Sequence, residues 1–205
     1  MASNEQETQT LTDSFEAFDR EVLNIRMAWE FWSLINGSAI GGPNPQILFD
    51  AAPKFHWYTR QSLLAVVVLG LSRLADPLKT QGRENLTLER IYKETESSHH
   101  IAPEVRAKQA MNKALELIGS DDFRKVRNEA LAHNARATVM GQDASLHHKV
   151  IRHAVDWVAK FHRRIKAVRG GASIILAPGE GAFPAPDDVQ VCRQEITSLI
   201  DRLDA

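Results

Sequence analysis

Cysteine is nearly absent from this sequence: Cys192 is the only one in 205 residues. A single cysteine excludes an internal disulfide and suits a reducing compartment. The N-terminus, Met1 to Glu5, is polar and acidic and lacks the basic and apolar regions of a signal peptide. The most apolar run, Leu63 to Leu71, is far shorter than the roughly 20 residues that a membrane span needs. We therefore expect a soluble, cytoplasmic protein without a membrane partner.

The chain also lacks an excess of charge of one sign. Lys and Arg number 25, Asp and Glu number 26, and the formal net charge is −1. A nucleic-acid partner would therefore need a local basic patch. Hydrophobic residues make up 43% of the sequence, which is enough for one domain with its own core.

Motifs for phosphate loops and metal sites are missing as well. Gly41-Gly42 lacks the strand–loop–helix setting and the lysine of a P-loop. The adjacent histidines, His99-His100 and His147-His148, point to different sides of a helix, and no second cysteine or tight His-x3-His pair supports them as zinc ligands. Cys192 falls on an apolar helical stripe, which is typical of a core residue. We expect no metal and no cofactor.

Helical periodicity is what the sequence does contain. Apolar residues from Leu11 to Trp32 follow alternating steps of four and three, which predicts a long amphipathic helix ended at Gly37 to Pro45. A second helix is predicted from Pro53 to Ala75, with Asp76-Pro77 ending it. Its middle is apolar on every side, so we expect it to be the central buried helix. Further helices are predicted at Thr87 to Glu96, Ala102 to Ile118, from about Asp122, from Asp143 to Gly170, and at Asp187 to Leu203. The helix from Asp143 carries an apolar stripe at spacings of three and four, formed by Ile151, Ala154, Val158, Phe161, Ile165 and Val168.

These patterns predict an all-α fold in three parts. Residues 1–10 are expected to be a disordered N-terminus, residues 11–171 a helical bundle with a central apolar helix, and residues 172–205 an extended arm and a C-terminal helix. That last helix is acidic and amphipathic, and it either docks against a partner or packs on a second protomer. Its apolar residues are Val189, Cys192, Ile196, Leu199 and Leu203.

One octet concentrates the reactive side chains: Arg127-Asn128-Glu129-Ala130-Leu131-Ala132-His133-Asn134. Ser120 and Asp121 precede it as N-cap residues, and Gly119 ends the helix before. On a straight helix Arg127 and His133 do not share a face. A long arginine must reach across, or a second copy of the chain must complete the site.

This octet resembles the HEPN signature, in which an arginine, usually followed by a polar residue, is separated from a histidine by a further four to six residues, near the end of a helix. A second stretch is similar to abortive-infection HEPN proteins of the AbiU type. It runs from Leu71-Ser72-Arg73-Leu74-Ala75-Asp76-Pro77-Leu78-Lys79-Thr80 through Gly82 and Glu84-Asn85-Leu86 to Leu88-Glu89-Arg90. The resemblance extends from Phe15 to about Arg169. It implies a HEPN-like helical bundle and metal-independent RNA cleavage that leaves 2′,3′-cyclic phosphate ends, at a site formed where two protomers meet.

The octet carries the groups that such a reaction needs. Attack of a ribose 2′-OH on its own phosphate requires proton transfer, which the imidazole of His133 can perform at cellular pH. It also requires a cation on the phosphate, and the guanidinium of Arg127 can hold two phosphate oxygens at once. We therefore assign Arg127 and His133 as the catalytic pair, with Asn128, Glu129 and Asn134 supporting them. The predicted partners are RNA, a second protomer in a homodimer, and an antitoxin or other neutralising protein.

The predicted long helix near the C-terminus adds a basic surface. Between His147 and Arg169 it carries seven Lys or Arg against one acid, Asp156, which suits a phosphate backbone. We expect RNA contacts from Arg152, Arg163, Arg164 and Arg169. The alternative is that these charges are simply solvated.

Alternatives remain for the octet and for the function. A histidine near a helix end is often a C-cap, and Glu129, one turn before His133, can simply pair with it. Three functions therefore stay open. The first is an endoribonuclease acting in phage defence or as a toxin of a toxin–antitoxin pair. The second is an inactive HEPN-like bundle that binds RNA or nucleotide. The third is a protein-binding bundle with an antitoxin or assembly role.

Overall fold

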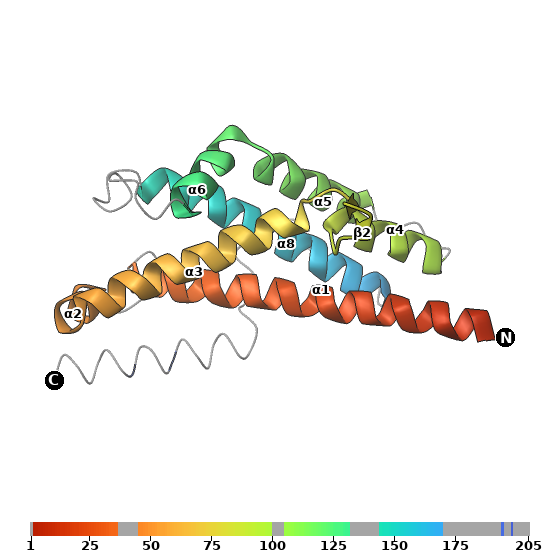
Figure 1. The fold of residues 1–205 in the computed structure, drawn as a ribbon, viewed down its shortest axis with the longest axis horizontal. Coiled ribbons are helices and arrows are strands. Elements are labelled where there is room, and N and C mark those ends of the chain that lie inside the picture. Colours follow the sequence, from red (N-terminus) through yellow and green to blue (C-terminus); the bar gives the residue numbers. More distant parts are fainter. Residues whose placement is uncertain are drawn as a thin grey trace.

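The computed structural model describes residues 2–36, 45–99, 105–131 and 144–169, together with Gln194 and Ser198. Within these ranges the chain is almost entirely helical, which confirms the predicted all-α class (Figure 1). The helices are α1 (Ala2–Ile35), α2 (Pro45–Ala51), α3 (Pro53–Leu74), α4 (Leu88–His99), α5 (Val105–Ile118), α6 (Asp121–Leu131) and α8 (Ala144–Arg169). None of these described helices is long and apolar enough to cross a membrane.

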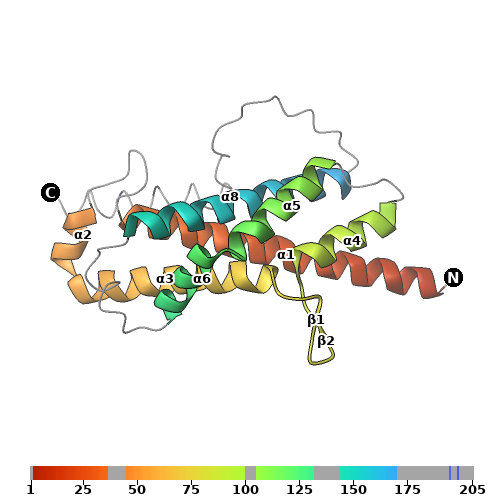
Figure 2. The same cartoon turned by 90° about the horizontal axis from the view of Figure 1, so that it is seen from above.

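Two helix pairs build the bundle. Helix α1 lies along α3, and α5 lies along α8 (Figures 1 and 2). Helix α8 also contacts α1, α4 and α6, so it joins the two pairs. Small residues on the buried face of α5 let its backbone approach α8 closely; they are Ala107, Ala110 and Ala114.

The core follows the apolar stripes that the sequence predicts for α1 and α8. On α1, Phe18, Val22, Ile25, Trp29 and Trp32 are all at most 6% exposed. The matching residues of α8 are Ile151, Ala154, Val158, Phe161 and Ile165, each at most 1% exposed. These side chains belong to one cluster, which also includes residues of α3 to α6. One core therefore holds α1, α3, α4, α5, α6 and α8 together, whereas Ile47 of α2 packs with Ile35 and Leu63 in a separate cluster.

Helix α3 differs from its predicted role as a helix buried on every side. Val67, Val68 and Leu71 are fully buried, but Val66 and Leu69 are 45% and 40% exposed. The apolar run Leu63 to Leu71 therefore lies on two faces of α3, and only one of these faces packs in the core. At the inner side, Gly70 permits the close approach of α1, because a Cβ there would lie 2.6 Å from Cγ1 of Ile25.

The ends of the predicted helices shift at two places. Helix α1 begins at Ala2, within the segment expected to be disordered. Helix α2, Pro45–Ala51, occupies a stretch that the sequence pattern leaves as a break before the second helix. A proline begins each of α2 and α3, where its missing N–H is not needed by the helix.

A short hairpin fills the loop predicted between α3 and α4. Strands β1 (Lys79–Thr80) and β2 (Arg83–Glu84) pair antiparallel, and the hairpin extends away from the helices (Figure 2). Gln81 and Gly82 form its turn with φ of 50° and 79°. Positive φ at both positions matches the right-handed twist of a two-residue hairpin.

The buried face of α3 gives a test of the architecture. Val67→Asp places a carboxylate at a position with 0% exposure, so we expect it to unfold or aggregate the protein, with a loss of more than about 3 kcal/mol. Val66→Asp is the matched control on the neighbouring, 45% exposed residue and should remain folded. Thermal melts and size-exclusion chromatography compare the two. Equal melting temperatures would place Val67 outside the core.

Candidate active site around helix α6

Helix α6 begins at a well-formed cap, as the sequence predicts. The Phe123 amide donates to Oγ of Ser120 at 3.2 Å, and the Ser120 hydroxyl donates to the Leu117 carbonyl at 2.6 Å. Asp121 and Asp122 lie in the first turn, where negative charge is favourable. The link from α5 is tight, because the Gly119 amide returns to the Leu115 carbonyl at 2.8 Å. The start of α6 is therefore fixed relative to α5.

Two buried side chains then fix the rotation of α6. Phe123 and Val126 are each 1% exposed and belong to the core, and α6 packs on α3 and α8. Arg127 comes directly after Val126 and is half-buried, whereas Asn128 is exposed. Arg127 therefore sits at the edge of the packed face.

The structure describes only part of the predicted site. Glu129 lies in α6, but its side chain is outside the described atoms, and His133 and Asn134 lie outside the described residues. Arg127 has no hydrogen bond or ion pair from its side chain within the described part of the chain. Its neighbour Arg124, one turn earlier, contacts Asp121 at 3.4 Å and donates to the Gly119 carbonyl at 2.9 Å. The two arginines of α6 therefore differ: Arg124 closes the helix start, and Arg127 makes no such contact among the described residues.

Arg60 is a further candidate that the sequence patterns did not single out. It precedes the buried residues Leu64 and Val67 by four and seven positions, so it lies on the inner face of α3. Helix α6 contacts α3, and in Figure 2 it crosses α3. Burial lowers the pKa of Arg60, and no charged group among the described residues adds to or offsets this effect. By contrast, Glu94 partly offsets the effect of burial on the pKa of Arg169.

The four arginines predicted to bind RNA are not equivalent. Arg152 is exposed, and Arg163 lies eleven residues later, about three helical turns, so both are on one side of α8. Arg164 is half-exposed and turned to a neighbouring side. Arg169 lies with its guanidinium 4.4 Å above the ring of Phe15, which favours a packing role.

Some of this positive charge is already used within the protein. Burial raises the pKa of Asp156, and Arg152 and Lys160 oppose that rise, so these cations lie near its carboxyl group. Lys160 also lies 4.1 Å above the ring of Trp157. The basic side of α8 is therefore a mixed surface in which Arg152 is the most accessible of the four arginines.

Most of the chain matches one known family. A family model described as AbiU2, of the HEPN type, matches residues 8–157. The chain belongs to the AbiU2 family of HEPN proteins. The family name relates it to abortive infection, and the matched span contains both stretches that carry the resemblance. No curated protein and no solved structure gives a match.

The AbiU-like stretch from Leu71 to Arg90 has a structural role in this AbiU2-family chain. The side-chain amide of Asn85 donates from Nδ2 to the Pro77 carbonyl and to Oγ1 of Thr80, both at 2.7 Å. These two bonds close the base of the hairpin. The hydroxyl of Thr87 accepts from the Arg90 amide at 3.1 Å and caps α4. These contacts explain why short polar residues occur at these positions.

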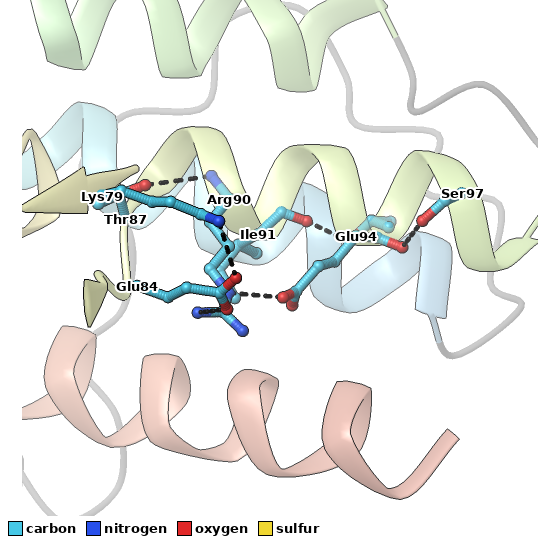
Figure 3. A network of polar contacts seen from close by, with 8 residues as sticks. Lys79, Glu84, Thr87, Arg90, Ile91, Glu94 and Ser97 are labelled. Carbon is cyan, nitrogen blue, oxygen red and sulfur yellow. Dashed lines mark hydrogen bonds and ion pairs between the residues drawn. The ribbon is translucent and has the colours of Figure 1, made fainter. Parts of the chain in front are cut away.

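Arg90 links the hairpin to α4. Its guanidinium lies 3.0 Å from Oε2 of Glu84 on β2 and donates to Oε1 of Glu94 at 2.6 Å (Figure 3). The second carboxylate oxygen of Glu94 is buried and has no hydrogen-bond partner among the described residues. Arg90 therefore balances two carboxylates. The stretch that supports the AbiU2 assignment thus stabilises the hairpin and the start of α4, at a distance from α6.

A second polar cluster joins α1 to α8. The His162 ring donates from Nε2 to Oδ1 of Asp19 at 2.6 Å, and Nζ of Lys166 lies 3.5 Å from the same oxygen. The His162 ring stacks on Phe15 and meets Phe18 edge-on. Burial lowers the pKa of His162, although the hydrogen bond and charge of Asp19 oppose this. Burial alone would raise the pKa of Asp19, but His162 and Lys166 outweigh it and keep that pKa low.

The described ranges contain no candidate metal site. Among the residues at 2–36, 45–99, 105–131 and 144–169, no group of three or more His, Cys, Asp or Glu side chains is placed to hold a metal ion.

Among the described histidines, His148 has a shifted pKa as well as His162. The ring of His148 lies 5.1 Å from that of Trp29. Burial lowers its pKa, and the charge of Arg152 lowers it further.

The His162 cluster predicts a loss of stability in mild acid. In the folded protein the pKa of His162 is below its ordinary value of 6.5. As the pH falls through that value, His162 therefore binds a proton in the unfolded chain before it does so in the folded protein. The free energy of unfolding should then decrease, by at most about 1.4 kcal/mol per pH unit for each such histidine. His162→Gln keeps a donor for Asp19 but cannot titrate, so its unfolding free energy should vary less between pH 7 and 5.

Denaturant titrations at several pH values measure this difference. His148 remains in the variant, so the pH dependence should weaken rather than vanish. His153→Gln, at an exposed position on α8, is the control and should leave the wild-type dependence unchanged. If His162→Gln and wild type lose stability in parallel, the His162–Asp19 contact does not control the acid response.

Proposed function

We propose that this AbiU2-family protein is a metal-independent endoribonuclease, acting in phage defence or as the toxin of a toxin–antitoxin pair. The supporting observation is the state of Arg127. A rigid, capped helix holds this guanidinium at the edge of the core, and within the described residues it has no ion-pair partner. A half-buried cation without a carboxylate favours an anionic ligand.

The proposed reaction uses two groups of the octet. The ribose 2′-oxygen attacks the adjacent phosphorus, and the bond from phosphorus to the 5′-oxygen breaks. His133 moves the proton, either from the 2′-OH or to the leaving 5′-oxygen. Arg127 binds the non-bridging oxygens, on which negative charge builds up. The products are a 2′,3′-cyclic phosphate and a 5′-hydroxyl, so the atoms balance without a metal or a cofactor.

Arg60 and the remaining octet residues have supporting roles in this proposal. Arg60 provides a second guanidinium on the inner face of α3, which packs against α6. Asn128 is exposed beside Arg127 and is suited to donate to a phosphate oxygen. Glu129 and Asn134 are proposed to orient the imidazole of His133 and set its charge.

Substitutions at the catalytic pair test the mechanism. His133→Ala should abolish RNA cleavage with little change in melting temperature. Arg127→Lys should also abolish it, because a point charge cannot replace a two-pronged grip on the phosphate. Arg124→Lys, one turn earlier on α6, is the matched control and should retain activity. Cleavage of mixed RNA is followed with and without EDTA, and a substrate with a 2′-deoxy at the cleavage site should be inert.

The outcomes separate the three functional classes. Cleavage that survives His133→Ala, or that stops with EDTA, excludes the proposed mechanism. A wild-type protein that binds RNA without cutting it is an inactive HEPN-like scaffold, and one that does neither is a protein-binding bundle. Loss of folding in His133→Ala would identify the histidine as a helix cap.

The active unit is proposed to be a homodimer. If the helix continued straight, Arg127 and His133 would not share a face, so two copies meeting near α6 would bring each arginine to the histidine of its partner. Mixing Arg127→Lys with His133→Ala protein should then restore part of the activity, because a mixed dimer holds one intact pair. Light scattering at micromolar concentration gives the mass. A monomer, or inactive mixtures, would contradict a shared site.

RNA capture is assigned to the basic side of α8. Arg152→Glu with Arg163→Glu should weaken RNA binding at low salt, and the difference should shrink at high salt. The slope of log affinity against log salt should fall by about 0.7 for each phosphate of a single strand that the variant no longer binds. Lys108→Glu with Lys113→Glu on α5 changes the charge equally and is the control. If both double variants bind RNA equally well, the charges of α8 are a solvated surface and do not bind RNA.

A further inference from the structure

The outward face of α3 carries an uncovered apolar stripe. Phe55 and Tyr58 are 63% and 65% exposed, and Val66 and Leu69 are 45% and 40% exposed. Together with the exposed Ser62 between them, they recur every three or four residues and form one continuous face, here termed the α3 stripe. A contiguous apolar face of this kind marks a surface that another element covers.

The α3 stripe points away from the proposed active site. The inner face of α3 carries Leu64, Val67 and Leu71 into the core shared with α1 and α6. The stripe lies on the opposite side of the same helix. Contact between two copies around α6 would therefore leave it uncovered.

The charge of α3 disfavours a second copy of the same helix as the covering element. The helix contains Lys54, Arg60 and Arg73 and no acidic residue. Antiparallel packing of two α3 helices would bring Lys54 of one copy towards Arg73 of the other, and parallel packing would align like with like. Like charges across an interface are unfavourable. Arg73 already pairs with Glu21 of α1 at 2.6 Å, which shows that this side of the bundle accepts carboxylates.

The C-terminal segment has the complementary chemistry. From Asp187 to Leu203 it contains four acidic and two basic residues. Its apolar residues also recur in steps of three and four, from Val189 to Leu203. The ends of this stripe are 14 positions apart, as are Phe55 and Leu69, and both separations correspond to about 21 Å of helix.

Two described residues of this segment agree with an amphipathic helix. Gln194 and Ser198 are helical and exposed. They lie one turn apart, and on a helical projection both fall opposite the apolar side that contains Cys192, Ile196 and Leu199. The two described residues of the segment therefore lie on its polar side and are exposed.

The connection is long enough to reach α3. Seventeen residues separate Arg169, at the end of α8, from Asp187. Fully extended they span at most about 60 Å. Arg169 lies over Phe15 of α1, and from there to the end of α1 at Ile35 is about 30 Å. Since α1 lies along α3, the whole α3 stripe is within reach.

We propose that the segment Asp187–Leu203 docks as a helix on the α3 stripe of its own chain. Its apolar side covers the exposed aromatic and aliphatic side chains of α3, and its carboxylates complement the positive charge of that helix. Docking keeps this apolar face from contacting other proteins, while α6 on the opposite side stays open.

The single cysteine allows a direct test on the full-length protein. Cys192 lies on the docking side, so its thiol should react slowly with a maleimide or a disulfide reagent. Val66→Glu should increase the rate at least about tenfold, which corresponds to a docking free energy weakened by roughly 1.4 kcal/mol. Val105→Glu is the matched control, since Val105 is 72% exposed on α5, and it should react like wild type. A wild-type thiol as reactive as in urea-unfolded protein would overturn the proposal.

Cross-linking then identifies the occupant. Tyr58→Cys, Ser62→Cys and Val66→Cys each add a second cysteine on the α3 stripe, and the three positions sample the helix register. Oxidation should close a disulfide within one chain for at least one of them, because a disulfide needs Cα atoms closer than about 7 Å. Lys108→Cys on α5 should remain unlinked. Covalent dimers in place of the internal bond would assign the stripe to a second copy, and no bond from any position would leave the segment undocked.

Discussion

The packing of α8 against α1 and α5 is the contact on which the rest of this structure depends. The buried residues of α8, from Ile151 to Ile165, meet the stripe of α1 on one side and the alanines of α5 on the other. Because α5 presents Ala107, Ala110 and Ala114, the two backbones approach closely and α8 becomes the common neighbour of both helix pairs. The tight turn at Gly119 then passes this geometry on to α6.

The position of helix α6 depends on that contact, because α6 is too short to be stable without packing on the other helices. At eleven residues it is too short to be stable alone in water. The Ser120 cap fixes where it starts, and Phe123 and Val126 fix which side faces the core. The result is a guanidinium at Arg127 on a rigid support, which is what binding of a phosphate in one geometry requires.

Sequence periodicity predicted the elements whose two sides differ chemically. The stripes of α1 and α8 and the start of α6 were found because apolar and polar residues alternate there with helical spacing. Helix α3 was misjudged because Leu63 to Leu71 is apolar all round, and periodicity cannot show which of those residues face the core. Arg60 was missed for a related reason: its importance arises from its place on an inner face, where no described carboxylate balances its charge. The local signature around Arg127 could be read from the sequence, whereas the packing of α3, which carries Arg60, against α6 is tertiary.

The two faces of α3 connect the proposed site to the proposed docking surface. Its inner side carries Arg60 and packs on α6, and its outer side carries Val66 and Leu69. Gly70 sets how closely α3 approaches α1, since Ile25 leaves no room for a larger residue. A helix clamped in this way moves as a unit, because packed interiors transmit strain. The outer and inner surfaces of α3 therefore belong to one helix and share no residue.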